Sequence, residues 1–295
     1  AGFLVITVQE PEAARTAGDG TRGLVPTMGY LHEGHLSLVE AARQMCDVVV
    51  MSLFVNPLQF DDPGDLERYP RNLDRDAELA EKAGVDVLFA PPPEVMYPEP
   101  STTTVSVSEV TATMEGEYRP GHFDGVTTVV AKLFAALQPD RAFFGRKDHQ
   151  QLTAVRRMHR DLLFPGEVVG CPTVREMDGL ALSSRNVRIE DRDRALSISK
   201  GLEAAAVAVE SGERRCQALT EIVRSELELD SVDYVELASQ SDAQHLDQLD
   251  RPAFLAVAGR VGEVRLIDNL PIDLVGEMFV VDRGIRLDVE SVVYR

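Results

Sequence analysis

The chain has 295 residues, of which 44% are hydrophobic and 27% charged, which is the composition of an ordinary globular protein of about two domains. Its 30 basic and 49 acidic side chains give a formal net charge of −19, and this argues against a general nucleic-acid-binding protein because phosphate contacts require the opposite sign. No apolar run approaches the ~18 residues of a membrane span. Any anion that this protein binds must therefore meet positive groups gathered locally.

Apolar, strand-like runs alternate with amphipathic helical patterns in the first part of the chain. The strand-like runs lie at residues 23–28, 47–55, 85–90 and 141–145, and helical patterns lie at 34–44, 124–137 and 147–162. This alternation predicts an α/β fold, a Rossmann-like parallel sheet with helices on both faces. We assign it to residues 1–171, with the proline-rich run at 91–100 expected as a loop at the sheet rim.

The pattern changes after residue 171. Two long helices are expected at about 190–210 and 214–229, followed by strands at 233–239, 253–261 and 263–270. Because helices and strands are grouped rather than alternating, residues 172–273 are predicted to form a smaller C-terminal α+β domain that acts as a lid. Residues 274–295 alternate apolar and polar side chains, so this extension of unknown role could add strands.

The cysteines and the N-terminal segment bear on the compartment. Cys46, Cys171 and Cys216 are odd in number and far apart, which fits neither a disulfide framework nor a zinc site and favours a reducing cytoplasm. Residues 1–14 carry no basic region ahead of their apolar residues, so we expect no signal peptide there.

One glycine pattern imitates a nucleotide-binding motif. Gly18, Gly20 and Gly23 have the GxGxxG spacing, but a dinucleotide site needs this motif after a strand and at the start of a helix. Here it precedes the strand expected at 23–28, so a turn is the favoured interpretation.

The strongest local signal is the segment PTMGYLHEGHLSLVEAA at 26–42. A strand ends at Met28, Gly29 permits a tight turn, and a helix opens near Gly34, whose N-terminal N–H groups and dipole suit an anion. His32 and His35 are three residues apart, which excludes the i, i+4 spacing of the HExxH zinc motif. Two histidines on a surface turn are the alternative, but the carboxyl end of a parallel strand favours a ligand site.

Three further clusters carry polar side chains at element ends. Gln59 follows a strand and could form hydrogen bonds with a hydroxyl or carboxylate. Lys147 stands where a strand passes into a helix, and Gln151 follows one turn later. Arg185, in ALSSRN at 181–186, could grip phosphate oxygens in a bidentate manner. The alternatives are a loop glutamine, a solvated lysine and a helix cap. Together with His32 and His35, Lys147 and Arg185 are donors that would surround a polyphosphate.

Six segments, in this order along the chain, carry a resemblance to a known family: PTMGYLHEGH, FVNPLQF, YPRNLDRD, RPGHFDGV, FFGRKDHQQL and PTVREMDGLALSSRN. From about Phe3 to Asp273 the chain strongly resembles the pantothenate synthetase (pantoate–β-alanine ligase) family. HEGH alone would indicate only the HxGH nucleotidylyltransferase superfamily, and the other segments narrow the resemblance.

The resemblance implies an enzyme, an AMP-forming ligase. It would join pantoate and β-alanine into pantothenate, using ATP and Mg²⁺, through a pantoyl-adenylate intermediate with release of AMP and pyrophosphate. It also implies a cytoplasmic homodimer, with no nucleic acid and no membrane among its partners.

The resemblance also implies residue roles. His35 would take the general-acid position beside His32, and Lys147 and Arg185 complete the expected catalytic set. Gln59 and Gln151 match pantoate-binding glutamines, Gln59 also serving β-alanine, and Asp76 matches an acidic position near the metal, while Tyr69 and Arg119 fall in family segments without a firm role. The expected ATP-binding residues are Met28, Gly29, Tyr30, Leu31, His32, Glu33, Gly34, His35, Gly145, Arg146, Lys147, Asp148, Val174, Leu182, Ser183, Ser184 and Arg185.

Three departures from the family pattern and three rival functions remain open from the sequence. Arg146 and His149 stand where Glu and an aromatic residue are common in the family, and Arg75 replaces an acid sometimes seen beside the metal position. The rival functions are another HxGH nucleotidylyltransferase that forms no amide, an aminoacyl-tRNA synthetase, which the acidity and short length oppose, and a catalytically silent nucleotide-binding module.

Overall fold

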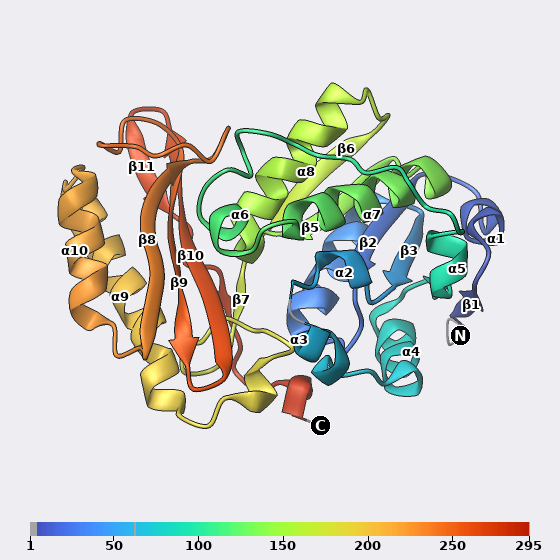
Figure 1. Cartoon of the computed structure of the whole chain (residues 1–295), viewed down its shortest axis with the longest axis horizontal. Helices are drawn as coiled ribbons and strands as arrows, with labels where there is room; N and C mark the ends of the chain where they lie inside the picture. Colours follow the sequence, from blue (N-terminus) through green and yellow to red (C-terminus); the bar gives the residue numbers. More distant parts are fainter. Residues whose placement is uncertain (1–4, 62, 295) are drawn as a thin grey trace. The chain divides into compact units, whose positions relative to one another are not determined.

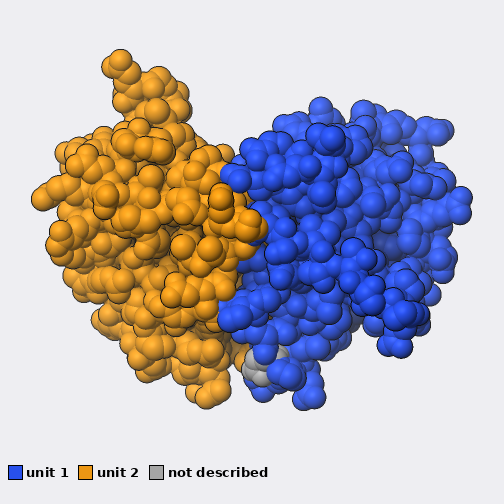
Figure 2. Space-filling model, turned by 45° about the horizontal axis from the view of Figure 1, so that its top comes forward, with its two compact units in different colours: residues 1–107, 119–145, 154–171 blue, residues 108–118, 146–153, 172–295 orange. Residues whose placement is uncertain are grey.

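The structure is a computed structural model that describes residues 5–61 and 63–294 (Figure 1). The outer ends of the predicted domains, residues 1–4 and 295, and the start of the resemblance at residue 3 lie outside the described residues. The chain divides into two compact units (Figure 2). Unit 1 comprises residues 1–107, 119–145 and 154–171, and unit 2 comprises 108–118, 146–153 and 172–295.

Unit 1 is built on a six-stranded sheet in the order β1-β4-β3-β2-β5-β6, with every pairing parallel. The strands are β1 (Ile6–Val8), β2 (Arg22–Thr27), β3 (Val48–Leu53), β4 (Val87–Phe89), β5 (Arg141–Gly145) and β6 (Glu167–Cys171). The predicted Rossmann-like class is confirmed, and β1 and β6 extend the four expected strands at the two edges of the sheet.

Helices lie against both faces of this sheet. They are α1 (Pro11–Thr16), α2 (Glu33–Met45), η1 (Pro57–Gln59), α3 (Pro63–Arg68), α4 (Leu73–Ala83), α5 (Pro93–Met96), α7 (His122–Leu137) and the later part of α8 (His149–Asp161). Successive side chains of a strand point to opposite faces. Accordingly, Phe143 joins the α2 residues Leu38 and Val39 in one core cluster, while Phe144 packs edge-on against Phe134 of α7.

The strand order sets where a ligand site is expected in unit 1. The chain steps from β2 to β3 and β4 in one direction, then returns to place β5 and β6 on the other side of β2. Open α/β sheets bind ligands at the carboxyl ends of the strands where the order reverses. The carboxyl ends of β2 and β5 meet this condition, because Gly23 and Leu24 pair with Arg141 and Ala142.

Unit 2 contains an antiparallel four-stranded sheet in the order β11-β10-β9-β8 and a parallel pair, β12-β7. Its elements are α6 (Glu115–Tyr118), η2 (Arg146–Asp148), β7 (Val174–Arg175), η3 (Asn186–Arg188), α9 (Arg192–Glu210), α10 (Cys216–Glu226), β8 (Ser231–Ser239), β9 (Ala253–Val261), β10 (Val264–Val275), β11 (Met278–Val281), β12 (Ile285–Arg286) and η4 (Val292–Tyr294). The apolar faces of α9 and α10 pack on the sheet and form the core, which includes Leu202, Leu219 and Leu255.

Several boundaries differ from the sequence expectations. The run at 91–100 contains the short helix α5 rather than loop alone, and the helix expected from 147 opens with the 3₁₀ turn η2. The glycines at 18 and 20 have φ of +76° and +106° in the turn before β2, so the turn interpretation is confirmed. Among the described residues, no helix is long and apolar enough to cross a bilayer.

Candidate active site

The loop that follows β2 makes a sharp turn in the left-handed region of backbone space. Gly29 has φ +84° and Tyr30, which carries a side chain, has φ +51°. A Cβ at Gly29 would lie 2.9 Å from Leu53 Cδ2 and 3.0 Å from Asp76 Oδ2, so the position requires glycine. This turn redirects the chain from β2 into α2.

The two histidines close the N-terminus of α2 as a capping box. His32 is the N-cap residue, and its Nδ1 accepts a hydrogen bond from the Gly34 N–H at 3.1 Å. The Nδ1 of His35 accepts from the His32 N–H at 3.3 Å, and the two rings lie 4.1 Å apart. Because Nδ1 is the acceptor in both rings, a neutral imidazole carries its proton on Nε2. The site therefore presents two Nε2–H donors next to a helix N-terminus.

Asp76 ties this loop to the first turn of α4. Its side chain is 2% exposed, and its two oxygens accept from the Tyr30 N–H and the Leu31 N–H, each at 2.7 Å. Burial raises the pKa of this carboxyl, and the N–H groups of Leu31 and Tyr30 act in the opposite direction. Arg75 lies over the Tyr30 ring at 4.9 Å and donates to the Leu31 carbonyl at 3.0 Å. Asp76 and Arg75 together hold Tyr30 and Leu31 in place.

These contacts bear directly on the metal role expected of Asp76. Both of its oxygens already accept backbone N–H groups in a buried position. Across residues 5–61 and 63–294, no group of three or more His, Cys, Asp or Glu side chains could hold a metal ion. The observed contacts give Asp76 the task of positioning the loop, and its metal role remains an expectation.

Gln59 is oriented by a buried asparagine that the sequence analysis did not single out. Asn56 is 1% exposed, and its Nδ2 donates to Gln59 Oε1 at 2.9 Å and to the Gly125 carbonyl at 3.0 Å. The Tyr97 hydroxyl donates to Asn56 Oδ1 at 2.8 Å, and burial raises the pKa of Tyr97 to about 12. With its oxygen engaged, Gln59 presents its NH₂ group as the donor. The sequence signal that could have identified Asn56 is an asparagine that precedes a proline at the end of a strand.

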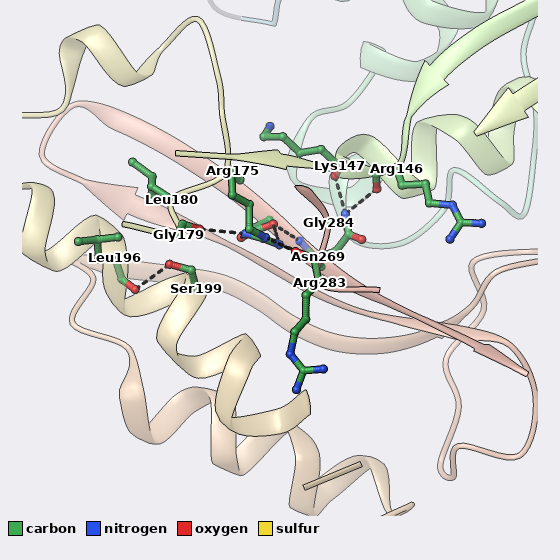
Figure 3. A network of polar contacts seen from close by, with 12 residues as sticks. Arg146, Lys147, Arg175, Gly179, Leu180, Leu196, Ser199, Asn269, Arg283 and Gly284 are labelled. Atoms are coloured by element: carbon green, nitrogen blue, oxygen red, sulfur yellow. Dashed lines mark hydrogen bonds and ion pairs between the residues drawn. The ribbon is translucent and has the colours of Figure 1, made fainter. Parts of the chain in front are cut away.

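In unit 2, Lys147 belongs to the turn η2, which follows directly on β5. Asn269 Nδ2 donates to the carbonyls of Arg146 at 2.9 Å and Lys147 at 2.5 Å (Figure 3). With both carbonyls facing Asn269, the side chains of Arg146 and Lys147 leave the turn in different directions. The guanidinium of Arg146 pairs with Asp273 at 2.9 Å and Asp282 at 3.2 Å. Asn269 therefore fixes the backbone that presents the Lys147 ammonium.

The segment with Ser183 and Arg185 is shaped by contacts within unit 2. The Arg185 N–H donates to Ser183 Oγ at 3.2 Å in a local turn just before η3. Arg185 is the N-cap residue of η3 and makes no side-chain cap hydrogen bond, so the helix-cap alternative is not realised there. Asn186 is 3% exposed, and its Nδ2 donates to Glu176 Oε1 at 2.7 Å and to the Ala181 carbonyl at 3.1 Å. The backbone around Arg185 thus depends on the buried Asn186, the amide of the segment at 181–186, in a holding role that the sequence did not indicate.

The expected site residues fall into two sets, one in each unit. Unit 1 carries the residues from 28 to 35, Gln59, Asp76 and Gly145, and unit 2 carries the residues from 146 to 148, Gln151, Val174 and the residues from 182 to 185. Within unit 1 the structure brings together the loop after β2, the two histidines and Asp76. Within unit 2, Leu182 donates its N–H to the Val174 carbonyl at 3.0 Å.

The profile of the family described as "Pantoate-beta-alanine ligase" matches residues 5–271 of this sequence. The chain belongs to the pantoate–β-alanine ligase family. As a member of it, the protein is an enzyme, a ligase of pantothenate biosynthesis.

Relatives and solved structures agree with this assignment to the pantoate–β-alanine ligases. The pantothenate synthetase of Syntrophotalea carbinolica is 51% identical over 87% of this chain and 92% of its own length, and that of Ruegeria sp. is 52% identical over 85% and 91%. A crystal structure of pantothenate synthetase from Thermus thermophilus has a TM-score of 0.85 at 49% identity, covering 90% of this chain and 98% of its own.

A second solved member of the family carries ligands. The pantoate-β-alanine ligase of Francisella tularensis, crystallised in complex with "Beta-gamma ATP and Beta-alanine", has a TM-score of 0.75 at 33% identity. It covers 90% of this chain and 97% of its own length.

The three departures from the ligase pattern each have a structural partner. His149 stacks on Phe254 with ring centroids 4.5 Å apart, so it fills an aromatic position with an aromatic ring. Arg75 supports the Tyr30 ring and the Leu31 carbonyl. Arg146 pairs with Asp273 and Asp282, which lie beyond residue 271, where the family match ends.

Proposed function

We propose that this ligase joins pantoate to β-alanine in two steps, with ATP as the second substrate and pantoyl adenylate as the intermediate. The observation that carries the proposal is the histidine-capped N-terminus of α2 at the carboxyl end of β2, in a chain matched by the ligase profile. The Francisella relative with bound nucleotide and β-alanine supports ATP and β-alanine as the ligands.

The chemistry requires activation because a carboxylate is a poor acyl donor. A pantoate carboxylate oxygen attacks the α-phosphorus of ATP, and the bond from that phosphorus to the β-phosphate bridging oxygen breaks, releasing pyrophosphate. The neutral amine of β-alanine then attacks the acyl carbon, AMP leaves with the electron pair of the acyl–oxygen bond, and the amine loses a proton. No covalent bond to the protein is needed, so catalysis rests on positioning and electrostatic stabilisation.

The residues of unit 1 would stabilise charge at the α-phosphate. The positive dipole end of α2 and the Nε2–H groups of His32 and His35 would face this charge, and the capping box and Asp76 hold the turn in place. Preorganised donors of this kind act in the transition state without a reorganisation cost. His35 takes the general-acid position, and Gln59 offers its NH₂ group to pantoate and β-alanine.

The residues of unit 2 would bind the departing phosphates and pantoate. Lys147 supplies a point charge, and Arg185 with Ser183 supplies donors for phosphate oxygens. Gln151 lies on α8 close to Lys147 in sequence and would bind pantoate. The remaining residues expected to contact ATP are Met28, Gly29, Tyr30, Leu31, Glu33, Gly34, Gly145, Arg146, Asp148, Val174, Leu182 and Ser184.

Magnesium enters this proposal only with the nucleotide. Mg²⁺ is usually held by substrate phosphates and water together with one or two carboxylates. Since Asp76 is engaged with the loop backbone, we assign no side chain to the ion and no step to it.

We also propose a cytoplasmic homodimer. The three buried cysteines form no disulfide, which supports a reducing compartment, and the net charge of −19 argues against nucleic acid as a partner. The dimer rests on the family resemblance, and light scattering on the purified protein tests it. Division into domains at 1–171, 172–273 and 274–295 is likewise a proposal, tested by limited proteolysis.

The decisive test is mass spectrometry of the products formed from ATP, pantoate and Mg²⁺, with and without β-alanine. Pantothenate and AMP should form only when β-alanine is present. Pyrophosphate release without any amide would favour a nucleotidylyltransferase that transfers AMP to another acceptor, and no turnover at all would favour a silent binding module.

Replacing Gln151 with alanine should raise the KM for pantoate roughly tenfold, the effect of losing one hydrogen bond to a charged group. Its thermal midpoint should stay near that of the wild type, because Gln151 is only partly buried. Steady-state kinetics at saturating ATP and β-alanine measure the change, and Gln217→Ala on the exposed face of α10 is the matched control. Unchanged pantoate saturation would remove Gln151 from the site.

A further inference from the structure

The family match ends at residue 271, two residues before the resemblance seen in the sequence, so the C-terminal extension is redefined from this point as residues 272–294. It comprises the end of β10, then β11, β12 and η4. We propose that this extension is a positioning element for the nucleotide-binding segments of unit 2, an inference that rests on the proposed function. Three separate sets of contacts carry it.

The first contact is made with the turn that presents Lys147. Arg146 donates to Asp273 Oδ2 at 2.9 Å and to Asp282 Oδ2 at 3.2 Å. Both acids belong to the extension, and Arg146 itself departs from the residue common in the family. The two carboxylates hold the Arg146 guanidinium, so that Lys147 is the cation of this turn left to bind phosphate.

The second contact is a strand pairing. β12 pairs in parallel with β7, and Ile285 lies opposite Val174. The Ile285 N–H donates to the Thr173 carbonyl at 2.8 Å and the Leu287 N–H to the Arg175 carbonyl at 2.9 Å. Arg175 in turn donates to the Arg283 carbonyl at 2.9 Å (Figure 3). Because Val174 is an expected ATP contact, the extension supports a nucleotide-binding strand directly.

The third contact reaches the segment around Arg185. The Tyr294 hydroxyl donates to Glu176 Oε1 at 2.8 Å, and the same oxygen accepts from Asn186 Nδ2 at 2.7 Å. Arg192 donates to Glu176 Oε2 at 2.6 Å and to the Tyr294 hydroxyl at 2.8 Å. The neighbouring Val293 is fully buried, which anchors η4. Tyr294 therefore helps to orient Glu176, which orients Asn186 next to Arg185.

All three contacts reach segments expected to touch ATP. The extension also contacts α9, where Arg283 pairs with Glu203 and Glu210. A purely structural tail would be expected to contribute to stability alone. A positioning element should instead show its effect in the KM for ATP, because misplaced donors lose binding before they lose the fold.

Tyr294→Phe and Asp282→Asn test the proposal in the full-length enzyme. Tyr294→Phe keeps the ring and removes the hydroxyl, and Asp282→Asn removes one ion partner of Arg146. Each should raise the KM for ATP by roughly three- to tenfold, the range that an ordinary net hydrogen bond corresponds to, and change the KM for β-alanine less than twofold. Asp288→Asn, at an exposed position of the same extension, removes the same charge and should match the wild type.

Calorimetric titration of the same variants with ATP supplies a readout independent of turnover. Weaker ATP binding by both variants supports the proposal. An unchanged KM and unchanged Kd for ATP, even with a lowered melting temperature, would overturn it, since the extension would then serve stability only. A wild-type enzyme that binds ATP but forms no pantothenate would instead refute the proposed function.

Discussion

Lys147→Ala is expected to slow pantoyl-adenylate formation by at least ~10²-fold, the size typical of losing a preorganised donor at a developing charge. The Lys147 backbone is held by Asn269 at 2.5 Å, so the substitution should remove the ammonium without disturbing the turn. Single-turnover measurement of pyrophosphate release from ATP and pantoate isolates this step from product release.

Lys200→Ala is the matched control for this charge removal. Lys200 is exposed on α9, and its loss should leave the single-turnover rate within about twofold of wild type. A wild-type rate for Lys147→Ala would show that the lysine is a solvated residue at the start of a helix, which is the alternative raised by the sequence.

Asp76→Ala is expected to lower the free energy of unfolding by roughly 2–5 kcal/mol, because two buried N–H groups would lose their acceptors. Adenylate formation should fall in parallel, since the turn at Gly29 and Tyr30 would lose its support. Asp76→Asn should produce a smaller loss, because one oxygen remains while the amide NH₂ faces a backbone donor. Urea unfolding and single-turnover kinetics measure the two effects.

The control for this prediction is Asp74→Asn, an exposed change in the same first turn of α4. It should leave both stability and rate near the wild-type values. A magnesium titration separates the positioning role from a metal role. If Asp76→Asn kept wild-type stability and only shifted the magnesium dependence, the carboxylate would be a metal ligand instead.

The histidine turn was the most predictable part of the site because its determinants are local. Gly29 permits the left-handed turn, and His32 and His35 cap a helix that begins within three residues of them. Strand ends, turn glycines and helix starts are written in neighbouring residues. The same holds for the four inner strands, whose apolar runs correspond closely to β2, β3, β4 and β5.

The residues that orient the site were not predictable because their partners are distant in sequence. Asn269 bonds to Lys147 across 122 residues and Tyr294 to Glu176 across 118. No local periodicity marks such a pair. The edge strands β1 and β6 are similar cases, since three or five residues become a strand only when a neighbour offers a hydrogen-bonding edge.

For Asp76, the sequence could not determine which role the carboxylate has. The sequence shows an acid near a position associated with metal in the family, and a carboxylate is equally able to accept N–H groups or to bind a cation. Burial and the two N–H partners, which the sequence does not reveal, show that Asp76 holds the loop.

The sequence by itself determined the α/β class, the helix that opens beside His32 and His35, and the family, because each depends on short-range patterns or on a shared order of motifs. The tertiary structure decided which side chains hold those motifs in place, among them Asp76, Asn56, Asn269 and Tyr294. Hydrogen bonds are short-ranged and directional. Folding must therefore bring a donor and its acceptor together before either residue can hold a motif in place.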